Sequence, residues 1–257
     1  MTIAIAYYLK NKMSFTKMIL TIASCLLIGA MAELKVLYAE FVIIVIACLI
    51  LSKKSLKSGT ILFISLVGII ASLMLFQIIF PGWASQMTSI SDFINIGFAT
   101  GGGYELSRLG AIADINNIWF KGDVIKNIFG YGFGSCEYSS FTLFTSDFSQ
   151  MYYSYHYSWF NFQKDFLETG FSGIIAYAIV IISMFIWITK NKRKYKDELG
   201  LGTVGQIYCV LMVVFFIYNS TLRTETGYMA YMYLAIPFIY YKSIIQENWE
   251  NKHAKLY

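Results

Sequence analysis

The chain has 257 residues, of which 57% are hydrophobic, 18% aromatic and only 14% charged. Water-soluble domains usually contain about 25% charged residues, so this composition argues against a soluble enzyme. It also excludes intrinsic disorder, which requires low hydrophobicity together with high net charge. The formal net charge of +5 is modest, and the sequence predicts an all-α integral membrane protein.

Long apolar runs occur in both halves of the chain. A spanning helix needs about 20 mostly apolar residues. Residues 1–9 are apolar but too few to span, and they lack the basic start of a signal peptide, so they resemble the end of a longer segment. The sequence predicts about six transmembrane helices, at residues 18–32, 36–51, 60–80, 171–189, 204–218 and 228–245.

Basic residues cluster beside these runs, at positions 10–17, 53–57, 190–196 and 252–255. Lysine and arginine are enriched on the cytoplasmic side of short loops, and one orientation places all four clusters there. Both termini are then cytoplasmic. The predicted parts of the chain are N-terminal transmembrane helices (1–81), a large extracytoplasmic loop (82–170), C-terminal transmembrane helices (171–245) and a cytoplasmic tail (246–257).

Arginine is scarce in this chain and unevenly placed. Only three of the 20 basic residues are arginines. Arg193 lies in a predicted cytoplasmic cluster, whereas Arg108 and Arg223 fall on the predicted outer side. A planar guanidinium binds phosphate or carboxylate bidentately, which lysine does not, so the two outer arginines indicate anion binding. An ordinary surface ion pair, such as Arg223 with Glu225, explains the same pattern.

The predicted outer loop is far longer than an ordinary connection and is rich in aromatic residues. Tryptophan and tyrosine are enriched at membrane interfaces, so most of these rings are interpreted as interfacial packing; others would stack on sugars or line a groove for a lipid. The loop contains Gly130-Tyr-Gly-Phe-Gly134, a pattern that permits tight turns and close backbone approach. A nucleotide-binding fingerprint would need a preceding strand, which is not predicted. We expect short helices near the interface.

His156 is the only histidine on the predicted outer side. No second histidine or cysteine cluster accompanies it, so the sequence indicates no metal site. An imidazole in this loop can serve as a general base or can position a ligand by hydrogen bonding; it can equally be a polar residue at the membrane interface. An amphipathic helix is predicted from Lys164, entering the next span through Gly170 and Gly173.

The order of these motifs resembles that of the O-antigen polymerase and ligase superfamily, bacterial membrane glycosyltransferases with lipid-diphosphate donors. The family pattern has a basic residue at an outer turn, an arginine opening the large loop, a G-x-G-x-G stretch, a histidine, and E-x-G-x-x-G entering the next span. The matching residues are Glu33-Leu-Lys35, Ser107-Arg108-Leu-Gly110, Gly130-Tyr-Gly-Phe-Gly134, His156 and Glu168-Thr-Gly170-Phe-Ser-Gly173. Family members typically have more spans, so the resemblance implies that this chain corresponds to their C-terminal half.

The resemblance implies transfer of a glycan from a polyprenyl diphosphate carrier to a sugar hydroxyl, at the outer face of a bacterial cytoplasmic membrane. Such a reaction polymerises the repeat units of O-antigen, exopolysaccharide or capsule. Cations must neutralise the leaving diphosphate, and this role falls to Arg108, Arg223 and Lys35. His156 is the implied catalytic partner of the acceptor hydroxyl, together with Arg108, and Glu168 would orient the histidine. The chain has no D-x-D motif, which favours a glycosyltransferase without metal or other cofactor.

The implied partners are a lipid-linked oligosaccharide, membrane lipid, a chain-length regulator and a flippase, and nucleic acid is not expected. Three alternatives remain open. A ligase uses the same donor and differs only in its acceptor. A transporter subunit would suit six spans, but the sequence shows no inverted repeat, and Pro237 is the only proline inside a predicted span. A non-catalytic membrane scaffold would suit a chain that matches only half of the family pattern.

Overall fold

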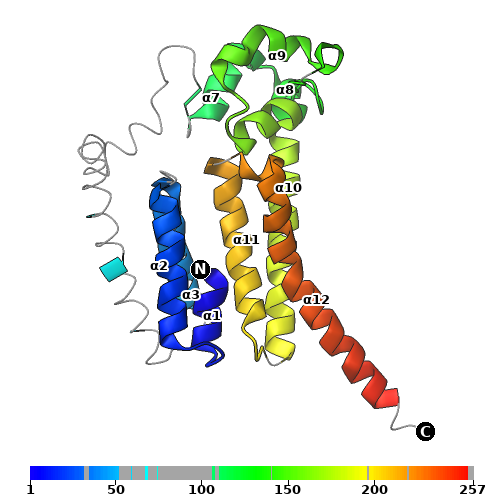
Figure 1. Ribbon diagram of the computed structural model, residues 1–257. Coiled ribbons are helices and arrows are strands. Elements are labelled where there is room, and N and C mark those ends of the chain that lie inside the picture. The colour runs from blue at the N-terminus through cyan, green and yellow to red at the C-terminus, as the bar shows by residue number, and fades with distance from the viewer. Residues whose placement is uncertain are drawn as a thin grey trace. The chain divides into compact units, whose positions relative to one another are not determined.

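The structure, a computed structural model, describes residues 1–31, 35–51, 59, 67–68, 74, 106–107, 110–139, 141–195, 197–218 and 220–253 (Figure 1). These residues form helices and connecting turns without any strand, which confirms the predicted all-α class for this part of the chain. The α-helices are α1 (Thr2–Leu9), α2 (Phe15–Met31), α3 (Lys35–Leu51), α7 (Ala111–Ile115), α8 (Val124–Phe129), α9 (Asp147–Tyr152), α10 (Asn161–Lys194), α11 (Leu201–Tyr218) and α12 (Glu225–His253).

The chain divides into two compact units. Unit 1 comprises Met1–Pro81, Ile182–Met212 and Met229–Tyr257, and unit 2 comprises Gly82–Ile181 and Val213–Tyr228. The boundaries fall within α10, α11 and α12, so each of these helices contributes to both units. In unit 2, α7, α8 and α9 gather at the end where α10 begins (Figure 1).

Two helices, α10 and α11, are long and apolar enough to cross a membrane. In the most apolar 18-residue stretch of α10 only 11% is buried, whereas 61% of the corresponding stretch of α11 is buried. The predicted spans 18–32 and 36–51 correspond to α2 and α3, each 17 residues long, and residues 228–245 lie in α12, which contains Pro237. Most of the predicted span 60–80 lies outside the described residues. Six spans, their orientation and an extracytoplasmic loop stay predictions.

Buried polar contacts tie together the helix ends of unit 1. Asp197 is buried and caps α11, because its carboxylate accepts hydrogen bonds of 3.2 and 3.3 Å from two backbone N–H groups of the first turn. Lys192 donates to the carbonyl of Leu51 at 2.9 Å and to the side chain of Gln206 at 2.8 Å. The last carbonyls of a helix lack partners within it, and a cation is favourable there. Lys192 therefore stabilises the end of α3.

Aromatic side chains form the core of unit 2. The buried ring of Trp119 contacts four other rings edge-to-face, with centroids 5.2–6.3 Å apart; they belong to Phe148, Tyr152, Tyr155 and Tyr157. Such pairs add to the free energy gained by burying the rings from water. The sequence interpretation assigned most rings of this region to the membrane interface, whereas these rings are packed against one another. Trp119 and Tyr157 are buried by this packing, and the other three rings are partly buried.

Candidate functional site

The glycine-rich stretch lies directly against α10. Helix α8 ends at Phe129 and is followed by Gly130, which has a φ of +69°. The backbone N–H groups of the next two residues donate to the carbonyls of Leu167 and Glu168, both at 2.8 Å. Helix α10 is interrupted shortly afterwards by Gly170, with φ +60° and ψ −154°. A break of this kind leaves carbonyls of the preceding turn without helical donors, and the glycine-rich stretch supplies two.

Two glycines make this close approach possible. A Cβ atom at Gly130 would lie 2.5 Å from the backbone nitrogen of Thr169 and 2.6 Å from the carbonyl oxygen of Glu168. A Cβ atom at Gly170 would lie 2.5 Å from the carbonyl oxygen of Asn127. Heavy atoms do not tolerate such distances, and a side chain is also costly at positive φ. The two glycine motifs of the sequence therefore meet in one backbone junction.

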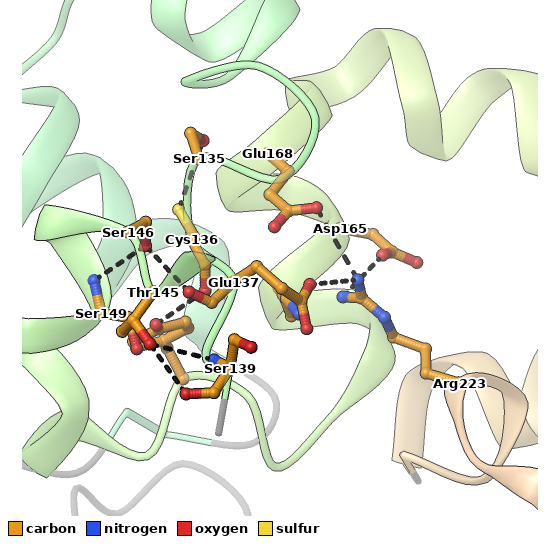
Figure 2. A network of polar contacts seen from close by, with 12 residues as sticks. Ser135, Cys136, Glu137, Ser139, Thr145, Ser146, Ser149, Asp165, Glu168 and Arg223 are labelled. Atoms are coloured by element: carbon orange, nitrogen blue, oxygen red, sulfur yellow. Dashed lines mark hydrogen bonds and ion pairs between the residues drawn. The ribbon is translucent and has the colours of Figure 1, made fainter. Parts of the chain in front are cut away.

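A charged cluster surrounds Arg223, which lies in the short turn between α11 and α12. Its Nη1 is 3.2 Å from Oδ1 of Asp165, and its Nη2 is 3.5 Å from Oε2 of Glu137 and 3.7 Å from Oε2 of Glu168 (Figure 2). Lys164 forms a further ion pair with Glu137. These five residues, which all belong to unit 2, are called the charged cluster below.

The charged cluster contains more negative than positive groups. Three carboxylates face two cations, which leaves one excess negative charge when all are ionised. Lys164 and Glu168 are buried, whereas the side chain of Arg223 is 31% exposed. Burial raises the pKa of Asp165, and the neighbouring guanidinium limits that rise.

Glu168 has one carboxylate oxygen without a partner. Its side chain is only 3% exposed, and its Oε2 faces Arg223. Its Oε1 is fully buried and has no hydrogen-bond partner within the part of the chain that the structure describes. An unsatisfied buried acceptor costs about 1–3 kcal/mol. Oε1 is therefore an acceptor site for any donor that enters the cluster.

His156 is held in an unusual backbone conformation, with φ +54°, at the end of the short helical turn Tyr153–Tyr155. Outside glycine, this left-handed region is visited mainly by asparagine, aspartate and histidine. The imidazole stacks on the ring of Trp159, with centroids 4.0 Å apart. The next residue, Tyr157, is buried and donates its hydroxyl to the carbonyl of Cys136 at 2.8 Å. This anchor fixes the backbone beside the histidine.

The structure does not describe the side chains of the two other predicted cations, Arg108 and Lys35. Arg108 lies outside the described residues, and Lys35 is the first residue of α3, in unit 1. Ser107, which precedes Arg108, is buried and donates from its N–H and Oγ to the carboxylate of Asp114, at 2.9 and 2.5 Å. Gln163 of α10 donates to the carbonyl of Ser107 at 3.2 Å. The backbone at Ser107 is thus fixed to the start of α10.

The structure adds three residues that the sequence did not single out as site residues: Glu137, Lys164 and Asp165. The sequence interpretation offered an anion or Glu225 as the partner of Arg223, and the side chain of Glu225 lies outside what the structure describes. The ion pairs of Arg223 with Glu137, Asp165 and Glu168 join segments far apart in the chain, and no local spacing indicates such pairs. The one sequence feature that could have drawn attention to these three residues is the rarity of charged residues in so apolar a chain.

Among the described residues, no group of three or more histidine, cysteine, aspartate or glutamate side chains is arranged to hold a metal ion. The three carboxylates of the charged cluster converge instead on a guanidinium (Figure 2). Comparisons with protein-family models, curated proteins and solved structures gave no match for this chain.

Proposed function

We propose that this protein polymerises lipid-linked oligosaccharide repeat units by glycosyl transfer at the outer face of a bacterial cytoplasmic membrane. The donor is a glycan on polyprenyl diphosphate, and the acceptor is a sugar hydroxyl of a second lipid-linked unit. The acceptor oxygen bonds to the anomeric carbon, the bond from that carbon to the diphosphate breaks, and polyprenyl diphosphate leaves.

The observation that carries this proposal is the backbone junction between the glycine-rich stretch and the Glu168–Gly170 segment. Two motifs that are distant in the sequence meet there through two hydrogen bonds of 2.8 Å. Glu168, which belongs to the junction, also contacts Arg223. Two of the five motifs on which the family resemblance depends are thus neighbours, and one of them contacts a cation, which supports a shared site.

The leaving diphosphate needs cations in a preorganised position. Arg223 suits this role because it is partly exposed and because a guanidinium has five N–H donors, more than its three carboxylate contacts require. The excess negative charge of the charged cluster prevents Arg223 from neutralising a diphosphate by itself. Most of the neutralisation is therefore assigned to Arg108 and Lys35, and the surrounding carboxylates hold the guanidinium of Arg223 in position.

The acceptor hydroxyl must lose a proton as its oxygen forms the new bond. His156 is the proposed base, because a neutral imidazole accepts a proton near neutral pH. Glu168 is the proposed orienting partner, and its unpartnered Oε1 is the acceptor that a hydrogen bond from the imidazole would use. Neither step requires a metal or another cofactor.

The test uses the full chain in liposomes, with a polyprenyl-diphosphate-linked repeat unit as the only added substrate and a chelator present. We expect a ladder of longer lipid-linked glycans and release of polyprenyl diphosphate. The substitution His156→Asn should abolish the ladder, since asparagine tolerates the left-handed backbone but cannot act as the base. If the unsubstituted chain leaves the lipid-linked donor unreacted, the proposal is refuted. If the donor is consumed only after a different acceptor molecule is added, the protein is a ligase. A normal ladder from His156→Asn would remove the histidine from the mechanism.

A further inference from the structure

Helix α8 separates apolar from polar residues on its surface. At 3.6 residues per turn, Val124, Ile125, Ile128 and Phe129 fall within an arc of roughly 140°, and Lys126 and Asn127 fall on the opposite side. This separation is clear even in so short a helix. In a water-soluble protein the apolar arc would be packed against the core.

The structure shows the reverse arrangement for α8. Its four apolar side chains are exposed, at 67%, 72%, 41% and 61% in chain order. The polar side faces another segment of unit 2, because Asn127 Nδ2 donates to the side-chain oxygen of Asn116 at 2.9 Å. The helix therefore presents an apolar surface outward and is held from its polar side.

Helix α8 cannot rotate to bury this surface, because its C-terminal end is fixed at the junction with α10. The backbone of Ile128 lies so close to Gly170 that a Cβ atom there would be 2.6 Å from the Ile128 carbonyl. Immediately after Gly170, α10 exposes apolar side chains spaced four residues apart: Phe171, Ile175 and Ile179. These side chains begin the apolar surface of a helix that is long enough to span a membrane. The C-terminal end of α8 thus adjoins the start of that apolar surface.

We propose that the apolar face of α8 docks into the interfacial region of the lipid bilayer, beside the point where α10 enters it. The occupant is lipid because the end of this helix adjoins the exposed apolar surface of a candidate spanning helix. Interfacial helices of this kind bury their apolar face at the boundary between headgroups and acyl chains. Docking would hold the backbone junction, and with it the glycine-rich stretch, at the level of the lipid headgroups. This inference does not depend on the transfer reaction.

The test uses full-length chains in phosphatidylcholine liposomes, each labelled with an environment-sensitive fluorophore on one introduced cysteine. Ile125→Cys places the label on the apolar face of α8. Gln150→Cys is the matched control, because Gln150 is exposed on α9 in the same unit. Fluorescence of the unsubstituted chain, which has four cysteines of its own, is subtracted. Quenching is measured with aqueous iodide and with lipids that carry a nitroxide either near the headgroup or near the acyl-chain end.

We expect the Ile125→Cys label to be quenched several-fold more by the headgroup nitroxide than by the acyl-chain nitroxide, with little effect of iodide. The Gln150→Cys label should be quenched by iodide and only weakly by either lipid. Iodide quenching of both labels to the same extent would overturn the proposal, since α8 would then face water. An Ile125→Cys label that neither lipid nor iodide quenches would also overturn it, because a protein surface would cover the helix.

Discussion

Gly130→Ala is expected to destabilise the protein by about 3 kcal/mol, whereas Gly134→Ala costs about 1 kcal/mol. Both glycines have positive φ, +69° and +74°, so both substitutions carry the cost of a side chain in the left-handed region. Only at Gly130 does the new Cβ atom meet the backbone of α10, 2.5 Å from the nitrogen of Thr169. At Gly134 nothing lies within 4 Å.

This pair of variants separates backbone strain from the collision between segments. In thermal unfolding of the detergent-solubilised chain, Gly134→Ala should lower the midpoint by roughly 2–4 °C and Gly130→Ala by roughly 6–12 °C. Equal losses in the two variants would show that the glycine-rich stretch does not pack against α10. The structural basis of the candidate site would then be wrong.

Arg223→Lys is expected to lower the rate of glycan polymerisation by at least about tenfold, while the amount of chain in the membrane stays normal. Lysine keeps the charge but has one nitrogen, whereas Nη1 and Nη2 of Arg223 contact different carboxylates at 3.2–3.7 Å. An ammonium cannot hold these contacts and bind a diphosphate oxygen at the same time. Partly exposed ion pairs contribute little to stability, so the loss should appear in glycan chain length and hardly in unfolding temperature.

The matched control is Arg193→Lys. Arg193 lies in a basic run near the end of α10, and its charge is predicted to set orientation only, which lysine does equally well. Glycan chain length should therefore be unchanged in this variant. If Arg223→Lys still produces full-length glycan, binding by the two guanidinium nitrogens of Arg223 is not part of the mechanism. If Arg223→Lys shortens the glycan only in proportion to a lower amount of protein in the membrane, Arg223 is needed for folding and not for the reaction.

Helices with a continuous apolar run were predictable because length and composition determine them locally. The predicted segment 36–51 corresponds to α3, Lys35–Leu51, and 204–218 to α11, Leu201–Tyr218. The predicted helix from Lys164 corresponds to the first part of α10, and Gly170 interrupts α10 where the predicted span 171–189 begins. The turn in the glycine-rich stretch is confirmed by its positive φ angles.

The arrangement of the site was not predictable in the same way, because it depends on contacts between distant segments. Glu137 and Asp165 meet Arg223 only after unit 2 has folded, and no spacing in the sequence indicates this. The aromatic core around Trp119 was not predictable for the same reason. A high content of aromatic residues indicates that rings are buried, but it does not indicate which surface each ring packs against. The roles of His156 and Arg108 stay predictions.

The orientation of unit 2 is the claim on which the proposed chemistry depends, and chemical labelling of one introduced cysteine tests it most directly. A membrane-impermeant maleimide is added to intact spheroplasts that carry Gln150→Cys on α9 or, as the control, Lys12→Cys near the N-terminus; both positions are exposed. We predict that Gln150→Cys reacts in intact spheroplasts and that Lys12→Cys reacts only after permeabilisation. The opposite pattern would place the charged cluster in the cytoplasm and would contradict transfer from a lipid-linked donor at the outer face.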